Sequence, residues 1–394
     1  MIKKDFMKGA LLSGLLLAGC VSFQSCSDDK NEPSEVQNPV NVVDSKNLDY
    51  SSDNANAWHN YSMKVAELLS RDASDLYSSW TESYEGGASY ASAFRAGNGF
   101  GYTSFLNCIE EIIDGCADIA NEVGEAKIGD PYDLYQNNRL EEALYAVESW
   151  YSWHSREDYT NNIYSVRNSY FGSLDGTVNE NSMAALVNSL DPTLDKTVRD
   201  AINTAAASIL AIPQPFRNNI NSSEARTAMD ACADLEQVLS RKLKPFFADL
   251  PSSYDSVLGE IVGNYVDAVV LPTYSQLKER AAALATAVKN LSSNRTDAAF
   301  ETACEAWLSA REPWERSEAF LFGPVDALGL DPNMDSWPLD QDAIVNHLKS
   351  GNFSDLEWNE GDDDDSVEAA QNIRGFHTLE FLLFKDGKPR KTAQ

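Results

Sequence analysis

The sequence predicts an all-α protein. Apolar residues make up 43% of its 394 positions, which is enough for more than one buried core. Long segments repeat apolar residues at intervals of three and four, the period of an amphipathic helix. No run of alternating β-branched residues bounded by hairpin turns competes with them. We therefore expect helix bundles as the architecture.

The expected helices lie between clusters of Gly, Pro, Asn and Ser, which interrupt the helical period. Six of them span residues 57–80, 105–125, 139–152, 197–212, 224–247 and 273–291. A seventh begins near residue 306 and ends at Gly323 and Pro324, where the backbone cannot continue as a helix. A last one begins at the capping box of Asp365 and Glu368 and ends at Gly387.

The N-terminus has the composition of a bacterial secretory signal. Residues 1–20, MIKKDFMKGALLSGLLLAGC, combine a basic start, a short apolar stretch and small residues before Cys20. We predict that Cys20 is lipidated, with Cys26 as the alternative acceptor. The protein would then be tethered to a membrane of the cell envelope, on its periplasmic or surface face. No later segment approaches the roughly 20 apolar residues that a membrane span needs.

The remaining chain divides into a tether and two predicted domains. Residues 21–50 are polar, hold prolines and lack periodicity, which suits a flexible tether. The segment 248–256, ADLPSSYDS, is the best domain boundary, so we expect domains at 51–250 and 251–394.

The net charge of the chain limits the classes of ligand that we expect it to bind. The chain holds 31 Lys and Arg against 61 Asp and Glu, a formal net charge of -30. This charge argues against binding to nucleic acid and favours the attraction of cations.

A buried helix near the C-terminus carries two polar residues. In GFHTLEFLLF, residues 375–384, His377 and Glu380 are three positions apart and so share one helix face. A buried carboxylate needs a partner or a metal ion, and Gly375 indicates the close approach of another segment. From this stretch alone, either a metal site or an internal polar pair would explain the two residues.

A second polar group lies in REPWERSEAFLFG, residues 311–323. Arg311, Glu315 and Glu318 fall at spacings of four and three on one helix face. Arg311 and Glu315 have the spacing of an ordinary helix ion pair. Glu318 stands among aromatic and aliphatic neighbours, which makes it the more informative residue of the three.

Three motifs together support a family assignment. REPWERSEAFLFGP, DSWPLD and GFHTLEFLLF follow one another in the order found in imelysin-like proteins, the bacterial family classed as M75 peptidases with a Gly-x-His-x-x-Glu motif. The segment ESWYSWHSRED resembles another motif of that family, through the residues Glu148, Ser149, Tyr151, Ser152 and Asp158. In the family this motif normally follows the His motif, so the chain resembles a circular permutant.

The resemblance implies two four-helix bundles packed together, with a site at their interface. In the iron-uptake relatives a metal site is formed by a glutamate, an aspartate and the His-x-x-Glu pair, which fall here on Glu318, Asp335, His377 and Glu380, with Asp331 as the alternative to Asp335. The interface would add Arg311, Glu148, Ser149, Ser152 and Asp158 as binding residues.

The resemblance favours a metal-binding protein of iron uptake, with iron as the expected ion and other iron-uptake proteins as partners. Three carboxylates and one imidazole suit a hard cation. Two alternatives stay open, an M75-type metallopeptidase and a metal-free binding protein for a peptide or glycan. The usual His-Glu-x-x-His motif of metallopeptidases is absent from the sequence, so we expect no catalytic residues.

Overall fold

The computed structural model describes residues 48–358 and 361–392, which lie within one compact unit, Pro39–Gln394. The predicted signal peptide, the lipid acceptors Cys20 and Cys26 and nearly all of the tether lie outside the described residues. In the described part of the chain, no helix has both the length and the apolar character that a membrane crossing requires.

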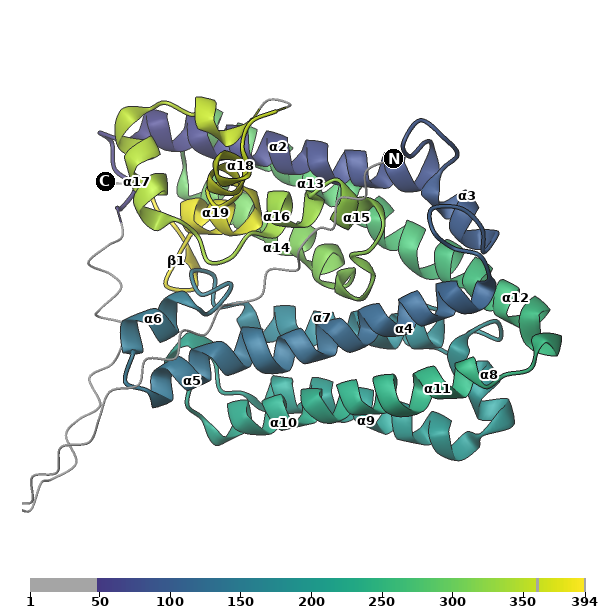
Figure 1. Cartoon of the computed structure of the whole chain (residues 1–394). Helices are drawn as coiled ribbons and strands as arrows, with labels where there is room; N and C mark the ends of the chain where they lie inside the picture. The colour runs from purple at the N-terminus through teal and green to yellow at the C-terminus, as the bar shows by residue number, and fades with distance from the viewer. Residues whose placement is uncertain (1–47, 359–360, 393–394) are drawn as a thin grey trace, which may run out of the picture. The chain divides into compact units, whose positions relative to one another are not determined.

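The fold is all-α, as predicted, and eight of its helices form two groups of four (Figure 1). In the first group each helix packs against two others, and its members are α4 (Phe105–Glu122), α7 (Ser155–Phe171), α9 (Pro192–Ala211) and α10 (Ser223–Val238). The second group closes in the same way and contains α2 (Ala55–Thr81), α13 (Leu271–Asn294), α14 (Asp297–Glu315) and α19 (Gly375–Leu383). Helix α14 packs against α7 and so joins the two groups.

Shorter elements connect and cover these groups. The α-helices among them are α3 (Tyr90–Arg95), α5 (Asp130–Gln136), α6 (Leu140–Tyr145), α8 (Met183–Leu190), α11 (Lys244–Ala248), α12 (Asp255–Tyr265), α15 (Pro324–Ala327), α16 (Leu330–Asp335), α17 (Gln341–Ser350) and α18 (Asp364–Gln371). Single π-helical turns are η2 (Val123–Gly129), η4 (Leu239–Leu243) and η6 (Val266–Val270). The 3-10 turns are η3 (Phe216–Asn218), η5 (Ser252–Tyr254), η7 (Glu318–Phe320) and η8 (Ser354–Leu356).

The one strand pair of the described residues follows α19. Strands β1 (Phe384–Lys385) and β2 (Lys388–Pro389) are antiparallel, with Phe384 opposite Pro389. Gly387 turns the chain between them with φ of +71°.

Helix α2 packs mainly with helices outside the domain to which the sequence assigns it. It lies in the range 51–250, yet it packs against α13 and α19, which both belong to the range 251–394. Its buried face, with Trp58, Val65, Leu69 and Leu76, completes the second group. The N-terminal helix therefore shares a core with the C-terminal helices, while the boundary near residue 250 and the permuted motif order stay predictions.

Three predicted helices are too long. The helix expected to end at Gly323 ends at Glu315, and the other two break within a continuous apolar period. The helix expected over 139–152 ends at Tyr145, and the chain then turns with positive φ at Ser149 and Trp153. The helix expected up to Gly387 is two helices, because the chain breaks before Gly375, which has φ of +83°. In both places the period of apolar residues continues across a turn, so periodicity alone does not reveal the break.

Candidate metal site

Helix α14 supplies Arg311 and Glu315 near its end. Pro313 has no N–H to donate to the carbonyl of Ser309, and the guanidinium of Arg280 donates to that oxygen instead, at 3.0 Å. The helix therefore continues as far as Glu315. The short turn η7 then places Glu318 beside Glu315, and both side chains are buried.

Gly375 fixes where α19 begins. A Cβ at this position would lie 2.4 Å from the carbonyl oxygen of Met334, closer than atoms can approach. Only glycine, which has no Cβ, can adopt a φ of +83° here without backbone strain and without a clash against Met334. The backbone of α19 thus starts directly against α16, and His377 faces Asp335, the last residue of α16. The close approach that the sequence predicted for Gly375 is confirmed.

His377 lies between two carboxylates and is fully buried. Its Nε2 is 3.1 Å from Oδ1 of Asp335, and its Nδ1 is 3.1 Å from Oε2 of Glu380. Burial and the charge of Arg311 act to lower the pKa of His377, but the two carboxylates outweigh them and raise it to about 9. The imidazolium donates from both nitrogens at neutral pH.

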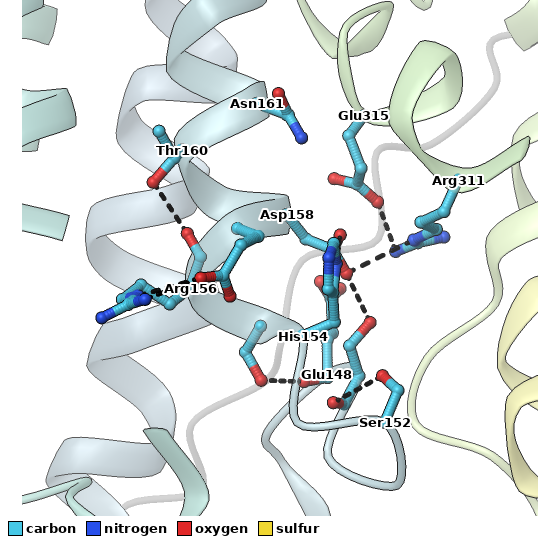
Figure 2. Close-up of polar contacts among 12 residues, drawn as sticks. Glu148, Ser152, His154, Arg156, Asp158, Thr160, Asn161, Arg311 and Glu315 are labelled. Atoms are coloured by element: carbon cyan, nitrogen blue, oxygen red, sulfur yellow. Dashed lines mark hydrogen bonds and ion pairs between the residues drawn. The ribbon is translucent and has the colours of Figure 1, made fainter. Parts of the chain in front are cut away.

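Arg311 is the central cation of the site, and its side chain is fully buried. Its guanidinium pairs with Asp335, lies 2.5 Å from Oε1 of Glu315 and lies 3.5 Å from Oδ2 of Asp158. Figure 2 shows Arg311 directed toward Glu315 and Asp158. Arg311 and His377 together outweigh burial and hold the pKa of Asp335 far below its usual range.

The turn that follows α6 lies against the network of Arg311, Asp158 and Glu380. The backbone N–H and the hydroxyl of Ser152 both donate to Oε1 of Glu380, at 2.7 Å each. The hydroxyl of Ser149 donates to Oδ2 of Asp158 at 2.5 Å, and Nδ1 of His154 lies 2.7 Å from Oδ1 of the same carboxylate. Of the predicted interface residues of this segment, Ser152 therefore contacts α19 and Asp158 lies beside Arg311 of α14. Ser149 contacts Asp158 on α7, and Glu148 contacts Lys127 on η2.

Three buried or half-buried carboxylates converge closely enough to hold one ion. Single oxygens of Glu315, Glu318 and Asp335 lie within 4.8 Å of one another. Burial raises the pKa of Glu315 to about 8 and raises that of Glu318 well above its usual value. Of the three, Glu318 alone has no hydrogen bond or ion pair with any described residue, although only 7% of its surface is exposed.

A pocket of about 260 Å³ opens beside this carboxylate group. Its charged lining residues are Glu122, Lys127, Glu148, Glu318, Asp331 and Asp335. Burial raises the pKa of Asp331 to about 7, with a further contribution from the charge of Asp335. The half-buried Trp337 completes one wall, and its ring meets the edge of the His377 ring at 4.7 Å between centroids.

The structure brings the four predicted metal ligands into one chain of contacts. Glu318 lies beside Asp335, Asp335 binds His377, and His377 binds Glu380. The sequence predicted only a helix pair with Arg311 for Glu315. That pair is present, but Glu315 also belongs to the carboxylate group. Which of these side chains bind an ion stays a prediction.

Glu122 and Lys127 line the pocket but were not predicted from the sequence. They lie at the end of α4 and on η2, outside every motif that the sequence presents. A π-helical turn inside a long helix is often found at functional sites, but the sequence gives no sign of one at residues 123–129.

These features define a class of protein with two packed helix groups and a buried network of carboxylates, arginine and histidine. The chain belongs to the imelysin family. The family model described as Peptidase M75, Imelysin, matches residues 39–242 and 270–394, which confirms the family predicted from the motifs.

Three relatives illustrate the range of similarity. A crystal structure of an imelysin peptidase from Bacteroides ovatus has a TM-score of 0.87 and 60% identity, covering 88% of this chain and 99% of that one. Iron-regulated protein A of Synechococcus elongatus is 33% identical over 133 residues, which are 34% of this chain and 33% of that protein. A putative iron-regulated protein A precursor from Parabacteroides distasonis has 37% identity and a TM-score of 0.41, covering 44% of this chain and 52% of that one. The chain thus matches about a third of the length of the curated relative.

Proposed function

We propose that the protein is a lipid-tethered protein of the cell envelope that binds a hard metal cation, iron in the first place. The ligands are the carboxylates of Glu315, Glu318 and Asp335. The proposal keeps Glu318 and Asp335 from the predicted ligand set and adds Glu315.

The single observation that carries the proposal is the position of Glu318. Its carboxylate is buried to more than nine-tenths, has no ion pair among the described residues and lines a pocket with four other acidic residues. A buried carboxylate without a partner destabilises a fold by several kcal/mol, on the order of the penalty for one desolvated charge. A bound cation removes that penalty.

The donor set fits a hard cation. Carboxylate oxygens are the preferred ligands of iron, manganese, magnesium and calcium, while a soft metal would need thiolates. The cysteines of the described chain, Cys108, Cys116, Cys232 and Cys304, are buried elsewhere as free thiols. Arg311 pairs with Glu315 and Asp335, and each carboxylate retains lone pairs for an ion.

His377 and Glu380 have a supporting role in this proposal. With protons on both nitrogens His377 has no lone pair for a metal ion, and it holds Asp335 instead. Glu380 in turn orients His377 and is itself fixed by Ser152. The motif Gly-x-His-x-x-Glu thus positions a ligand, in the way that outer residues commonly orient metal ligands.

Iron is favoured because one curated relative is named iron-regulated protein A. That name supports an iron-related role but does not say that the relative binds iron. The envelope location follows from the N-terminal signal sequence and from Cys20 as the lipid acceptor, which remain part of the proposal.

The test is a calorimetric titration of the purified protein with Fe(II), Fe(III), Zn(II) and Ca(II). The proposal expects near-stoichiometric binding of an iron ion, lost in Glu318→Gln and weakened at least tenfold in His377→Ala. If no metal binds at micromolar concentrations to correctly folded protein, the proposal fails. Cleavage of an unstructured protein substrate that is lost in Glu380→Gln would favour the metallopeptidase alternative.

A further inference from the structure

One amine shares the acidic pocket with the proposed ligands. Lys127, on the π-helical turn η2, is only 6% exposed. Its Nζ lies 3.0 and 3.1 Å from the two carboxylate oxygens of Glu148 and 3.5 Å from Oε1 of Glu122. It is the one cationic side chain that lines this pocket among the described residues.

The pocket retains negative charge beyond what Lys127 neutralises. Five acidic residues line it, and the ammonium group is bonded to only two of them, Glu122 and Glu148. Neither Glu318 nor Asp331 forms an ion pair within the described part of the chain. The pocket therefore attracts a second cation even when Lys127 is in place.

The charge of Lys127 nevertheless acts on Glu318. Lys127 and Glu318 line the same pocket, and the ammonium group of Lys127 is held there by Glu148 and Glu122. Two positive charges that share a buried pocket repel each other several times more strongly than they would in water. A metal ion on Glu318 and the ammonium group of Lys127 must therefore weaken each other's binding.

We propose that Lys127 is a built-in competitor of the metal ion and sets the affinity of the carboxylate site. The inference rests on the proposed function, since it assigns a regulating residue to that same site. Lys127 stabilises the acidic pocket in the absence of an ion. A metal ion that binds there is repelled by the positive charge of Lys127. A site of this kind binds its ion less tightly than its carboxylates would allow, and it releases the ion more readily.

Three variants separate charge from structure. Lys127→Met removes the charge and keeps a side chain of similar length. Lys127→Arg keeps the charge at the same position. Lys196→Met removes an equal charge from an exposed residue on α9, whose side chain is 75% exposed, and so controls for the change in net charge.

The experiment is a calorimetric titration of each full-length protein with Mn(II) in air and with Fe(II) under anaerobic conditions. We expect Lys127→Met to bind at least tenfold more tightly than the wild type, and Lys127→Arg and Lys196→Met to stay within threefold. Circular dichroism checks that each variant is folded, and if Lys127→Met is unfolded, Lys127→Gln takes its place.

The outcomes distinguish this inference from the function on which it rests. If the wild type binds and Lys127→Met binds equally or more weakly, Lys127 is a structural partner of Glu148 and the inference is overturned. If neither the wild type nor Lys127→Met binds either ion, the metal-binding proposal fails and the inference fails with it. Binding by Lys127→Met alone supports both.

Discussion

His377 Nε2 lies 3.1 Å from Oδ1 of Asp335, and this contact joins the C-terminal helix α19 to the end of α16. Both side chains are buried, and Asp335 also receives the guanidinium of Arg311. The contact makes the family motif part of a larger charge network that extends to α7 and α14. Experiments can test the charges of this network, the backbone contact that positions it and the ion that we assign to it.

Removing Arg311 should destabilise the fold strongly. Arg311→Met leaves the carboxylates of Glu315, Asp335 and Asp158 without their shared cation, and an unpaired buried charge typically costs about 3–5 kcal/mol. Urea unfolding should show a loss of about that size. Arg226→Met, which removes an exposed helix pair with Asp230, should cost less than ~1 kcal/mol. Equal losses for the two variants would show that the network contributes no more than a surface pair.

Gly375 should not tolerate a side chain. In Gly375→Ala the new Cβ meets the carbonyl oxygen of Met334, and the backbone has a positive φ, so we expect a loss of roughly 2–4 kcal/mol in urea unfolding. Gly263→Ala is the matched control, because Gly263 is helical and a Cβ added there would have no atom within 4 Å. Alanine there should stabilise α12 by up to ~1 kcal/mol. A neutral Gly375→Ala would contradict the close contact of α19 and α16.

Glu318 should lower the stability of the metal-free protein, although the metal-bound protein needs it as a ligand. Without a metal ion its buried charge lacks a partner, so Glu318→Gln should raise the free energy of unfolding by about 1–3 kcal/mol in the presence of a chelator. The same variant should lose metal binding. Thermal unfolding with and without the ion measures both effects. A Glu318→Gln protein that is less stable than the metal-free wild type would show that the carboxylate has a structural partner.

His59 should make the fold sensitive to acid, far from the metal site. Burial, with a smaller effect of the charge of Arg295, lowers the pKa of His59 to about 4. Because the unfolded value is about 6.5, the unfolded chain takes up a proton that the folded chain refuses, and stability is lost as the pH falls from about 6.5 toward about 4. The full effect of this group is ~3 kcal/mol.

The variant His59→Gln isolates this effect, since glutamine does not titrate and can still accept the hydrogen bond from Tyr50. Between about pH 7.5 and about pH 4.5 the wild type should lose about 2 kcal/mol more than the variant in urea unfolding. Parallel pH dependences for the two proteins would show that the folded His59 titrates normally.

The helical class and the family were predictable because they rest on local patterns. The spacing of apolar residues identifies α2, α4 and α13 closely. The breaks after Tyr145 and before Gly375 were not predictable, because the apolar period continues across them while the tertiary contacts of Ser152 and Met334 fix the turns.

The candidate site was predictable only where residues share a motif. His377 and Glu380 are three residues apart, and their contact follows from helix geometry. Lys127 meets Glu148 and the neighbourhood of Glu318 only through the packing of helices distant in sequence. Glu315 was not predicted as a ligand, because its spacing of four from Arg311 already explains it as half of a helix ion pair.

The central claim is that Glu318, with Glu315 and Asp335, binds a metal ion. Its most direct test is calorimetric titration of the wild type and Glu318→Gln with Fe(II) under anaerobic conditions. We expect one ion per chain for the wild type and no measurable binding for the variant. Equal binding by both proteins, or no binding by a folded wild type at micromolar iron, would contradict it.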